Sequence, residues 1–315
     1  MMRNTLAVTA TLLTVALLAG CAGQRQTLGA ALAYRGVDWP SDRTLLDLAY
    51  RDGAEFDDEK HRLDLFLPAE GTTDWPTLVF VHGGGWTHGD RRLGALGIEP
   101  MRNLGRFYAA RGYGVVVPSY RLQPGVDWAA QIDDVAAAVA WARENVGRFG
   151  GDPDAIALGG HSAGAWLAAR VGLADAPLAR HGTDRDGLCG LVLVSGAGYD
   201  LADEATYAAG ASRAYFERRF AGEGDWEAQA SVVTNVDAPA PPSLLLTAEG
   251  EGPTFERQSN RLYEVVAPLS PRSKRHEVAG QDHQRILVSM SLEGDPASET
   301  ALAFLAETDC ARASR

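Results

Sequence analysis

Short runs of apolar residues alternate with longer stretches of helical periodicity along most of this chain. Unbroken apolar runs of four or five residues are typical of strands that are buried on both faces of a parallel sheet. The expected strands are residues 77–81, 114–118, 155–158, 191–194, 243–246 and 275–278. Apolar residues at helical spacing, or helix-forming residues, follow at 132–146 and 163–174. This order predicts an α/β fold with a mostly parallel central sheet and crossover helices.

Two other segments complete the expected domain. Residues 45–51 and 62–67 alternate apolar and polar residues, which predicts an antiparallel strand pair at one edge of the sheet. Residues 198–240 scatter aromatic side chains among glycines, alanines and charges. An insertion of that length predicts a small cap or binding loop, with a surface excursion as the alternative. We expect one domain over residues 41–315 that carries this cap-like insertion.

Residues 1–20 have the layout of an export signal. Arg3 gives a positive start, and the apolar run of residues 6–18 is short for a bilayer span. The run leads into the sequence LAGC, which ends at Cys21 and resembles the bacterial lipoprotein signal. That resemblance implies cleavage before Cys21 and a lipid anchor on it, and Ala22 suggests the outer membrane, facing the periplasm. An ordinary secretory signal with an incidental cysteine is the alternative.

The segment after the signal, residues 21–40, is expected to be a polar tether. If Cys21 is acylated, Cys189 and Cys310 remain. They would form a disulfide in an oxidising compartment or stay as two buried thiols, because sequence cannot place two residues within bonding distance. Neither has a histidine at metal-ligand spacing, so no metal site is predicted.

The charge of the chain bears on its partners. The formal net charge is −12, and adjacent basic residues occur in clusters no longer than two. Binding to phosphates needs a basic face, so a nucleic-acid partner is not expected. The oligomeric state is not indicated by any pattern in the sequence.

The stretch GHSAG, residues 160–164, directly follows one predicted strand and opens a predicted helix. This is the position of a nucleophile elbow, in which glycines are required because a sharp strand-to-helix turn crowds the backbone. Ser162 is then expected at the carboxyl end of the strand, at a helix amino terminus that favours developing negative charge.

A second motif, HGGGW at residues 82–86, closes the predicted strand 77–81 at the same end of the sheet. With both motifs, the chain resembles the α/β-hydrolase superfamily, in the branch of hormone-sensitive-lipase-like esterases, feruloyl-esterase-like proteins and kynurenine formamidases. The resemblance runs from about residue 62 to the end. It implies an oxyanion hole formed by the N–H groups of Gly84, Gly85 and Ala163, with His82 structural. Trp86 and Tyr199 are expected in the substrate pocket.

Ser162 needs a general base, and the chain has seven histidines. In this fold the triad follows the order Ser, acid, His, which leaves His181, His276 and His283. His181 precedes the candidates for the acid, and His276 lies inside the predicted strand 275–278. His283 falls in the loop after that strand and is the predicted base.

The acid is expected in the loop after strand 243–246, which contains Glu249 and Glu251. In relatives the acid comes four residues after the position that Thr247 matches, and this count gives Glu251. A glutamate can orient the imidazole of the triad and stabilise its charged form as an aspartate does. Glu249 is the alternative.

These residues predict two-step acyl transfer without a cofactor. The expected enzyme is a carboxylesterase for short acyl or aryl esters, including acetylated or feruloylated carbohydrate. An arylformamidase resembling kynurenine formamidase is one alternative, although export argues against it because tryptophan breakdown is cytoplasmic. The other alternative is a non-catalytic, membrane-anchored binding protein on a hydrolase scaffold.

Overall fold

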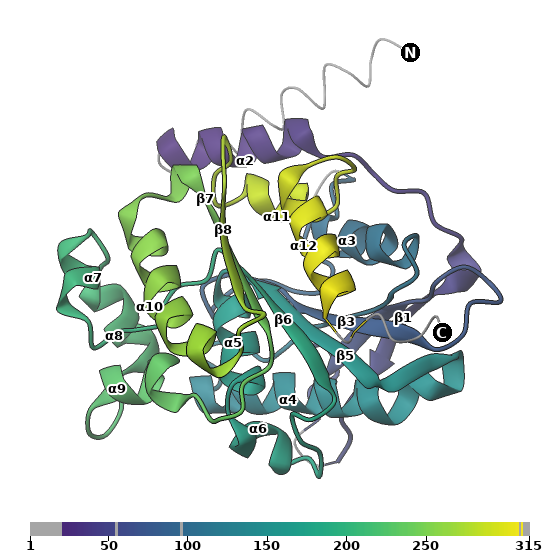
Figure 1. The fold of residues 1–315 in the computed structure, drawn as a ribbon, viewed down its shortest axis with the longest axis horizontal. Coiled ribbons are helices and arrows are strands. Elements are labelled where there is room, and N and C mark those ends of the chain that lie inside the picture. Colours follow the sequence, from purple (N-terminus) through teal and green to yellow (C-terminus); the bar gives the residue numbers. More distant parts are fainter. Residues whose placement is uncertain (1–20, 54–55, 95–96, 309, 311–315) are drawn as a thin grey trace.

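The computed structural model describes residues 21–53, 56–94, 97–308 and residue 310, and a twisted sheet lies at its centre (Figure 1). The strand order is β1-β2-β4-β3-β5-β6-β7-β8. The pairs β1–β2 and β2–β4 are antiparallel, and the other pairs are parallel. The prediction of a mostly parallel sheet with an antiparallel edge is confirmed. The strands are β1 (Thr44–Ala49), β2 (Arg62–Phe66), β3 (Trp75–Val81), β4 (Gly114–Pro118), β5 (Gly151–His161), β6 (Leu188–Val194), β7 (Ser243–Ala248) and β8 (Lys274–Val278).

Strand β3 shows why the central strands are apolar at almost every position. Val79 and Val81 belong to one buried cluster, whereas Leu78 and Phe80 belong to another. Successive side chains of a strand point to opposite faces, so the two clusters lie on the two faces of the sheet. Each large side chain buried in this way contributes roughly 1.5–3 kcal/mol.

Helices cover both faces of the sheet (Figure 1). Their buried residues divide between the same two clusters, which assigns each helix to a face. One face carries α3 (Pro100–Ala109), α11 (Arg285–Ser289) and α12 (Pro296–Glu307). The other carries α4 (Trp128–Asn145), α5 (Ala163–Gly172), α6 (Asp175–Ala179) and α10 (Pro253–Leu269).

The insertion between β6 and β7 is a set of short helices, grouped beside α10 at the left of Figure 1. They are α7 (Glu204–Ala208), α8 (Arg213–Phe220) and α9 (Trp226–Ala230), followed by the 3₁₀ turn η3 (Val233–Asn235). Asp203, Ser212 and Asp225 cap the three helices by accepting hydrogen bonds from backbone N–H groups. Phe216 and Phe220 bury the inner side of α8 in the core. The insertion is therefore packed against the sheet domain.

The structure differs from the expected tether, because helix α2 spans Cys21–Ala33. Its sequence includes several good helix formers, such as alanine and leucine, and the helix contacts α11. Ala30 is buried. The proposed signal peptide, residues 1–20, lies outside the described residues. In the described part of the chain, none of the helices is long and apolar enough to cross a membrane.

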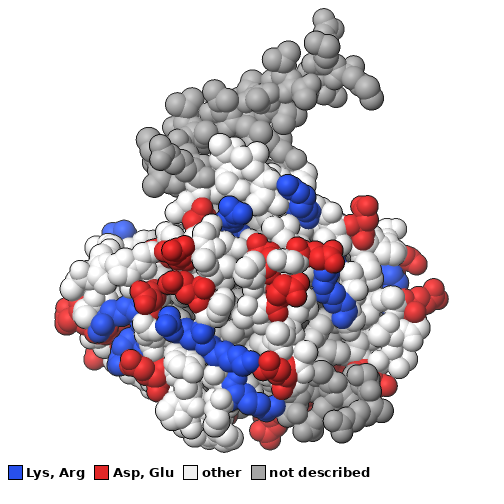
Figure 2. All heavy atoms as spheres, turned by 45° about the horizontal axis from the view of Figure 1, so that its top comes forward, with Lys and Arg blue, Asp and Glu red and all other residues white. Residues whose placement is uncertain are grey.

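The surface on the side of α2 carries charges of both signs. Figure 2 tilts this end of the molecule toward the viewer and shows Lys and Arg interspersed with Asp and Glu. Among the described residues, many of the arginines pair with carboxylates, as Arg257 does with Asp203.

Cys189 on β6 and Cys310 after α12 form a disulfide, with their Cα atoms 5.1 Å apart. The structure thus decides between the two alternatives that the sequence left open. The bond ties the segment after the last helix to the middle of the sheet.

Candidate active site

Ser162 occupies the sharp turn between β5 and α5, where its φ and ψ are 56° and −121°. Few non-glycine residues adopt such a backbone conformation, and it is maintained only where the surroundings impose it. A Cβ atom on Gly160 would lie 2.4 Å from the oxygen of Gly164, and one on Gly164 would lie 2.2 Å from the oxygen of Val81. Both glycines are therefore required for the turn that exposes Ser162.

Ser162, His283 and Glu251 form a continuous chain of hydrogen bonds. Nε2 of His283 lies 3.0 Å from Oγ of Ser162, and Nδ1 lies 2.5 Å from Oε1 of Glu251. The three residues follow β5, β8 and β7, which end at the same edge of the sheet because these strands run parallel. The Glu251 side chain is fully buried, whereas 19% of the His283 side chain is exposed.

The two glutamates of the loop after β7 have different partners. Glu251 contacts His283 through one carboxylate oxygen and accepts a 2.8 Å hydrogen bond from the Ala248 N–H through the other. Glu249 instead accepts a 2.8 Å hydrogen bond from the N–H of Gly280, at the start of the loop that carries His283. The structure therefore brings Glu251 to the imidazole and gives Glu249 a contact that joins the two loops.

The glycine loop after β3 turns sharply beside Ser162. Gly84 and Gly85 have positive φ values of 124° and 58°. A Cβ atom on Gly84 would lie 2.0 Å from the oxygen of His88, so this position accepts only glycine. The Gly84 oxygen accepts hydrogen bonds from the N–H groups of Thr87 and His88, which close the turn.

The N–H groups of Gly84, Gly85 and Ala163 donate to no acceptor among the described residues. Both glycines line a cavity with Ser162, and Ala163 is the first residue of α5, directly after Ser162. Unpaired N–H groups around a nucleophile can donate to an oxygen that becomes negatively charged. The oxyanion-hole role of the three residues stays a prediction.

Two cavities lie beside the triad and share Ser162, Tyr215 and His283. One, of about 490 Å³, is hereafter the glycine-loop cavity. Its other lining residues are Gly83, Gly84, Gly85, Thr87, His88, Leu93, His161, Arg219, Gln284 and Leu287. The second, of about 370 Å³, is hereafter the aromatic cavity, because Trp86, Phe216 and Phe255 line it. The insertion contributes to both through Tyr215 of α8, so it forms part of the candidate site.

The two expected pocket residues have different positions. Trp86 lines the aromatic cavity and packs edge-on against Trp166 and Phe220. Tyr199 lines neither cavity beside Ser162, and only 1% of it is exposed. Burial, together with the charge of Glu251, raises the pKa of Tyr199 above its ordinary value. Tyr199 is therefore a core residue behind the triad rather than a pocket residue.

His161, directly before Ser162, is a site residue that the sequence did not single out. Its Nε2–H donates a 2.8 Å hydrogen bond to the main-chain oxygen of His283. Burial and the nearby His283 lower the pKa of His161 to about 3, so its ring is neutral at neutral pH. Its position next to the nucleophile was the available signal, but the sequence does not show that the loop of His283 passes within reach.

His82 has the structural role expected for it. Its ring stacks on Tyr120 at 4.3 Å, and Nδ1–H donates to the oxygen of Gly83 at 2.7 Å. Burial lowers the pKa of His82 to about 4. A neutral, stacked His82 thus fixes the start of the glycine loop.

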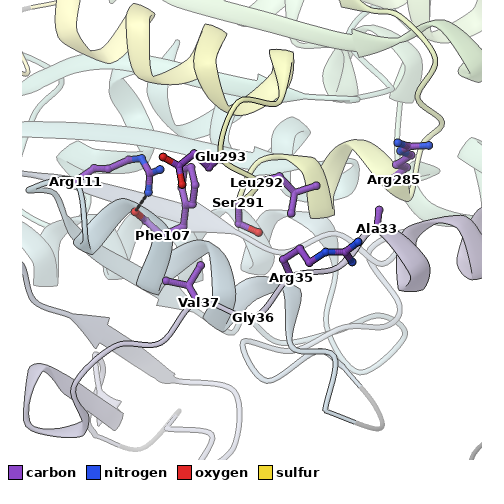
Figure 3. A pocket seen from close by; sticks show the side chains of 10 residues that line it. All are labelled: Ala33, Arg35, Gly36, Val37, Phe107, Arg111, Arg285, Ser291, Leu292 and Glu293. Carbon is purple, nitrogen blue, oxygen red and sulfur yellow. Dashed lines mark hydrogen bonds between the residues drawn. The ribbon is translucent and has the colours of Figure 1, made fainter.

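A further cavity, of about 590 Å³, lies away from the triad, between the chain after α2 and the region around α11 (Figure 3). Figure 3 shows Arg111 and Arg285 at opposite ends of it. Arg111 donates a 3.1 Å hydrogen bond to the oxygen of Phe107. None of Ser162, His283 and Glu251 lines this cavity, and we assign no chemistry to it.

Known proteins are similar to this chain in sequence and in fold. Esterase LipC of Mycobacterium tuberculosis is 41% identical over 118 residues, which cover 37% of this chain and 28% of LipC. Carboxylesterase NlhH of the same species is 39% identical over 106 residues, which cover 33% of this chain and 31% of NlhH. The chain therefore matches less than a third of the length of these relatives.

The crystal structure of an inhibited esterase B from Lactobacillus rhamnosis superimposes with a TM-score of 0.70 at 23% identity, and the match covers 94% of this chain and 96% of that one. At this identity the likeness shows a common fold, and the α/β-hydrolase fold predicted from the sequence is confirmed. The sequence profile of the BD-FAE family matches residues 63–266. Because this match covers well over half of the chain, the protein belongs to the BD-FAE family.

Proposed function

We propose that this protein is a carboxylesterase-type serine hydrolase that uses Ser162, His283 and Glu251. The observation that carries the proposal is the hydrogen-bonded chain from Ser162 Oγ through His283 to Glu251. Unpaired N–H groups beside Ser162 and the esterase relatives LipC and NlhH support it. A nucleophile, a base and an orienting acid with nearby N–H donors are the parts that acyl transfer requires.

In the first step, Ser162 Oγ attacks the ester carbonyl carbon and His283 Nε2 takes the serine proton. Glu251 accepts the hydrogen bond from Nδ1–H, which keeps Nε2 free to act as the base and stabilises the charged imidazole. The N–H groups of Gly84, Gly85 and Ala163 donate to the oxyanion. Removing one such donor typically costs about 3–4 kcal/mol of transition-state stabilisation.

When the tetrahedral intermediate collapses, the alcohol leaves with the proton from His283, and the acyl group remains on Ser162. His283 then takes a proton from water, whose oxygen attacks the acyl carbon. The second collapse releases the carboxylic acid and returns the proton to Ser162. This scheme uses no cofactor.

We propose short acyl or aryl esters as substrates, including acetylated or feruloylated carbohydrate. Cavities of about 490 and 370 Å³ flank Ser162, and each is large enough for one small group of an ester. Trp86, Phe216 and Phe255 give the smaller cavity an aromatic lining that suits an apolar or planar group.

A fluorophosphonate probe tests the nucleophile, because it labels serines that a neighbouring base activates. We expect the intact protein to be labelled and Ser162→Ala to stay unlabelled. A correctly folded protein that resists the probe, while a known serine esterase reacts, would instead support the binding-protein alternative.

A panel of nitrophenyl esters of increasing chain length, assayed beside N-formylkynurenine, tests the substrate class. We expect the highest kcat/KM with the short acyl chains. A higher kcat/KM with the formamide would replace the esterase proposal with the arylformamidase alternative.

We also propose that the chain is exported and anchored to the outer membrane through a lipid on Cys21, facing the periplasm. The lipoprotein-like sequence that ends at Cys21 supports this proposal. Growth of a bacterial host with a clickable fatty acid tests it. We expect label in the full chain and none in Cys21→Ser, and equal labelling of the two proteins would contradict the proposal.

A further inference from the structure

The glycine-loop cavity contains a positive charge and no carboxylate. Arg219 of α8 lines it, and none of its lining residues is Asp or Glu. Among the described residues, the hydrogen bonds of the Arg219 guanidinium go to two main-chain oxygens and to no carboxylate, although the chain as a whole has a net charge of −12. A cation in a concave, partly desolvated site attracts anions more strongly than one on an open surface.

The guanidinium of Arg219 is held in place by three contacts. Nε donates a 3.0 Å hydrogen bond to the oxygen of Gly85, and Nη1 donates a 2.9 Å hydrogen bond to the oxygen of Tyr215. The central carbon of the guanidinium lies 3.5 Å from the centre of the Tyr215 ring. Because the group is already oriented, an anion that binds it restricts little further side-chain motion.

These contacts leave Nη2 without a hydrogen-bond partner among the described residues. Two neutral carbonyl oxygens accept from Nε–H and from one of the two Nη1–H groups, and neither balances the positive charge. A guanidinium is a planar donor that suits a carboxylate. The free donor, the unbalanced charge and the adjacent cavity together point to an anionic ligand.

We propose that the preferred substrate is an ester with a carboxylate in its acyl or alcohol part, and that Arg219 binds this carboxylate in the glycine-loop cavity. This inference rests on the proposed esterase function. Ser162 and Arg219 line the same cavity of about 490 Å³, which has room for a group of benzoate size. Arg219 also contacts the residue whose N–H is a proposed oxyanion donor. The carboxylate and the reacting carbonyl would therefore occupy neighbouring positions.

Pairs of esters that differ only in charge test this proposal. The first pair places the charge on the alcohol: para-butyryloxybenzoate against para-butyryloxybenzamide. The second places it on the acyl group: para-nitrophenyl para-carboxybenzoate against its para-carbamoyl counterpart. The measurement is the ratio of kcat/KM for the anionic ester to that for the neutral ester, at low and at high salt.

The wild-type protein is expected to favour the anionic member of at least one pair by about 10- to 100-fold, the range for a hydrogen bond to a charged group. Arg219→Gln should bring this ratio close to one, and Arg219→Lys should keep part of it. High salt should lower the ratio. Arg218→Gln is the matched control, because Arg218 is an exposed neighbour on α8 that lines neither cavity.

The ratio separates specificity from a structural role. If Arg219 only holds the glycine loop, Arg219→Gln will slow both members of a pair equally, and that result would overturn the proposal. A wild-type ratio near one in both pairs, or an equal change in Arg218→Gln, would also overturn it. Failure to hydrolyse even the neutral esters would instead contradict the esterase function itself.

Discussion

His161 donates a hydrogen bond to the main-chain oxygen of His283 across 2.8 Å, so the residue before the nucleophile holds the loop that carries the proposed base. The backbone adds to this link, because the Gly250 N–H donates to the oxygen of Gln281. The turn of Ser162, the loop of Glu251 and the loop of His283 are thereby joined by hydrogen bonds that do not pass through the triad side chains.

Removing the His161 side chain should misplace His283. We expect His161→Ala to lower kcat on a neutral nitrophenyl ester by about tenfold or more, with a smaller change in KM, because loss of alignment affects the chemical step. His161→Gln retains an N–H donor and should recover part of the rate. Equal activity of both variants and the wild-type protein would show that this contact does not position the base.

Acid should destabilise the protein through its buried neutral histidines. Burial lowers the pKa of His161 to about 3 and that of His82 to about 4, whereas an unfolded histidine titrates near 6.5. The unfolded chain therefore binds protons that the folded protein does not, and stability falls as pH decreases below about 6.5. By pH 5, each histidine should remove about 2 kcal/mol.

Urea unfolding at pH 7 and at pH 5 measures this effect. His161→Gln should lose less free energy of unfolding between the two pH values than the wild-type protein does. An identical loss in both proteins would indicate that His161 does not contribute to the acid sensitivity.

The two glutamates of the loop after β7 should differ in their effect on catalysis. Glu251→Gln should reduce kcat by about 10³-fold or more. The neutral amide of glutamine can donate to Nδ1, which favours the tautomer with its proton on Nε2, and it does not stabilise the charged imidazole. Glu249→Gln should have a small effect, because that carboxylate bonds to the Gly280 N–H instead. The reverse order in steady-state kinetics would assign the acid to Glu249.

The glycine loop should not accept a side chain at Gly84. A Cβ atom there would lie 2.0 Å from a backbone oxygen, at a φ of 124°. We expect Gly84→Ala to lower kcat/KM by about 10²-fold or more, since the turn must open and move the proposed oxyanion donors. Gly147→Ala is the control, because nothing lies within 4 Å of its Cβ position. Similar kinetics for both variants would argue against this function of the loop.

The disulfide should stabilise the folded chain. Cys189 and Cys310 are 121 residues apart in sequence, and closing a loop of that size restricts the unfolded state. Replacing both with serine should cost about 2–5 kcal/mol and lower Tm. A reducing agent should lower Tm in the wild-type protein and leave the double variant unchanged. No difference between the two proteins in calorimetry would show that the bond contributes little.

Much of the fold follows from patterns that are local in sequence. The apolar run 77–81 has no alternation because β3 is buried on both faces, and alternating residues at 62–67 become the antiparallel strand β2. The predicted strand ends place Ser162 and the glycine loop at the same edge of the sheet, because the carboxyl ends of parallel strands lie together there. Helix α2 is the exception. A polar tether is expected over residues 21–40, whereas Cys21–Ala33 form a helix, because alanine and leucine favour that conformation.

The sequence by itself determined the succession of strands and helices along the chain, the elbow at Ser162 and the loops that supply His283 and a glutamate. Each of these features depends on residues close together in the chain, where the steric limits of a turn and the periodicity of the side chains decide the local structure. The tertiary structure alone decided that Glu251 faces the imidazole and that Tyr199 is buried in the core. It also decided that Cys189 meets Cys310 and that Arg219 lines the glycine-loop cavity. Such contacts join distant segments, and their geometry depends on how the whole sheet and its helices pack.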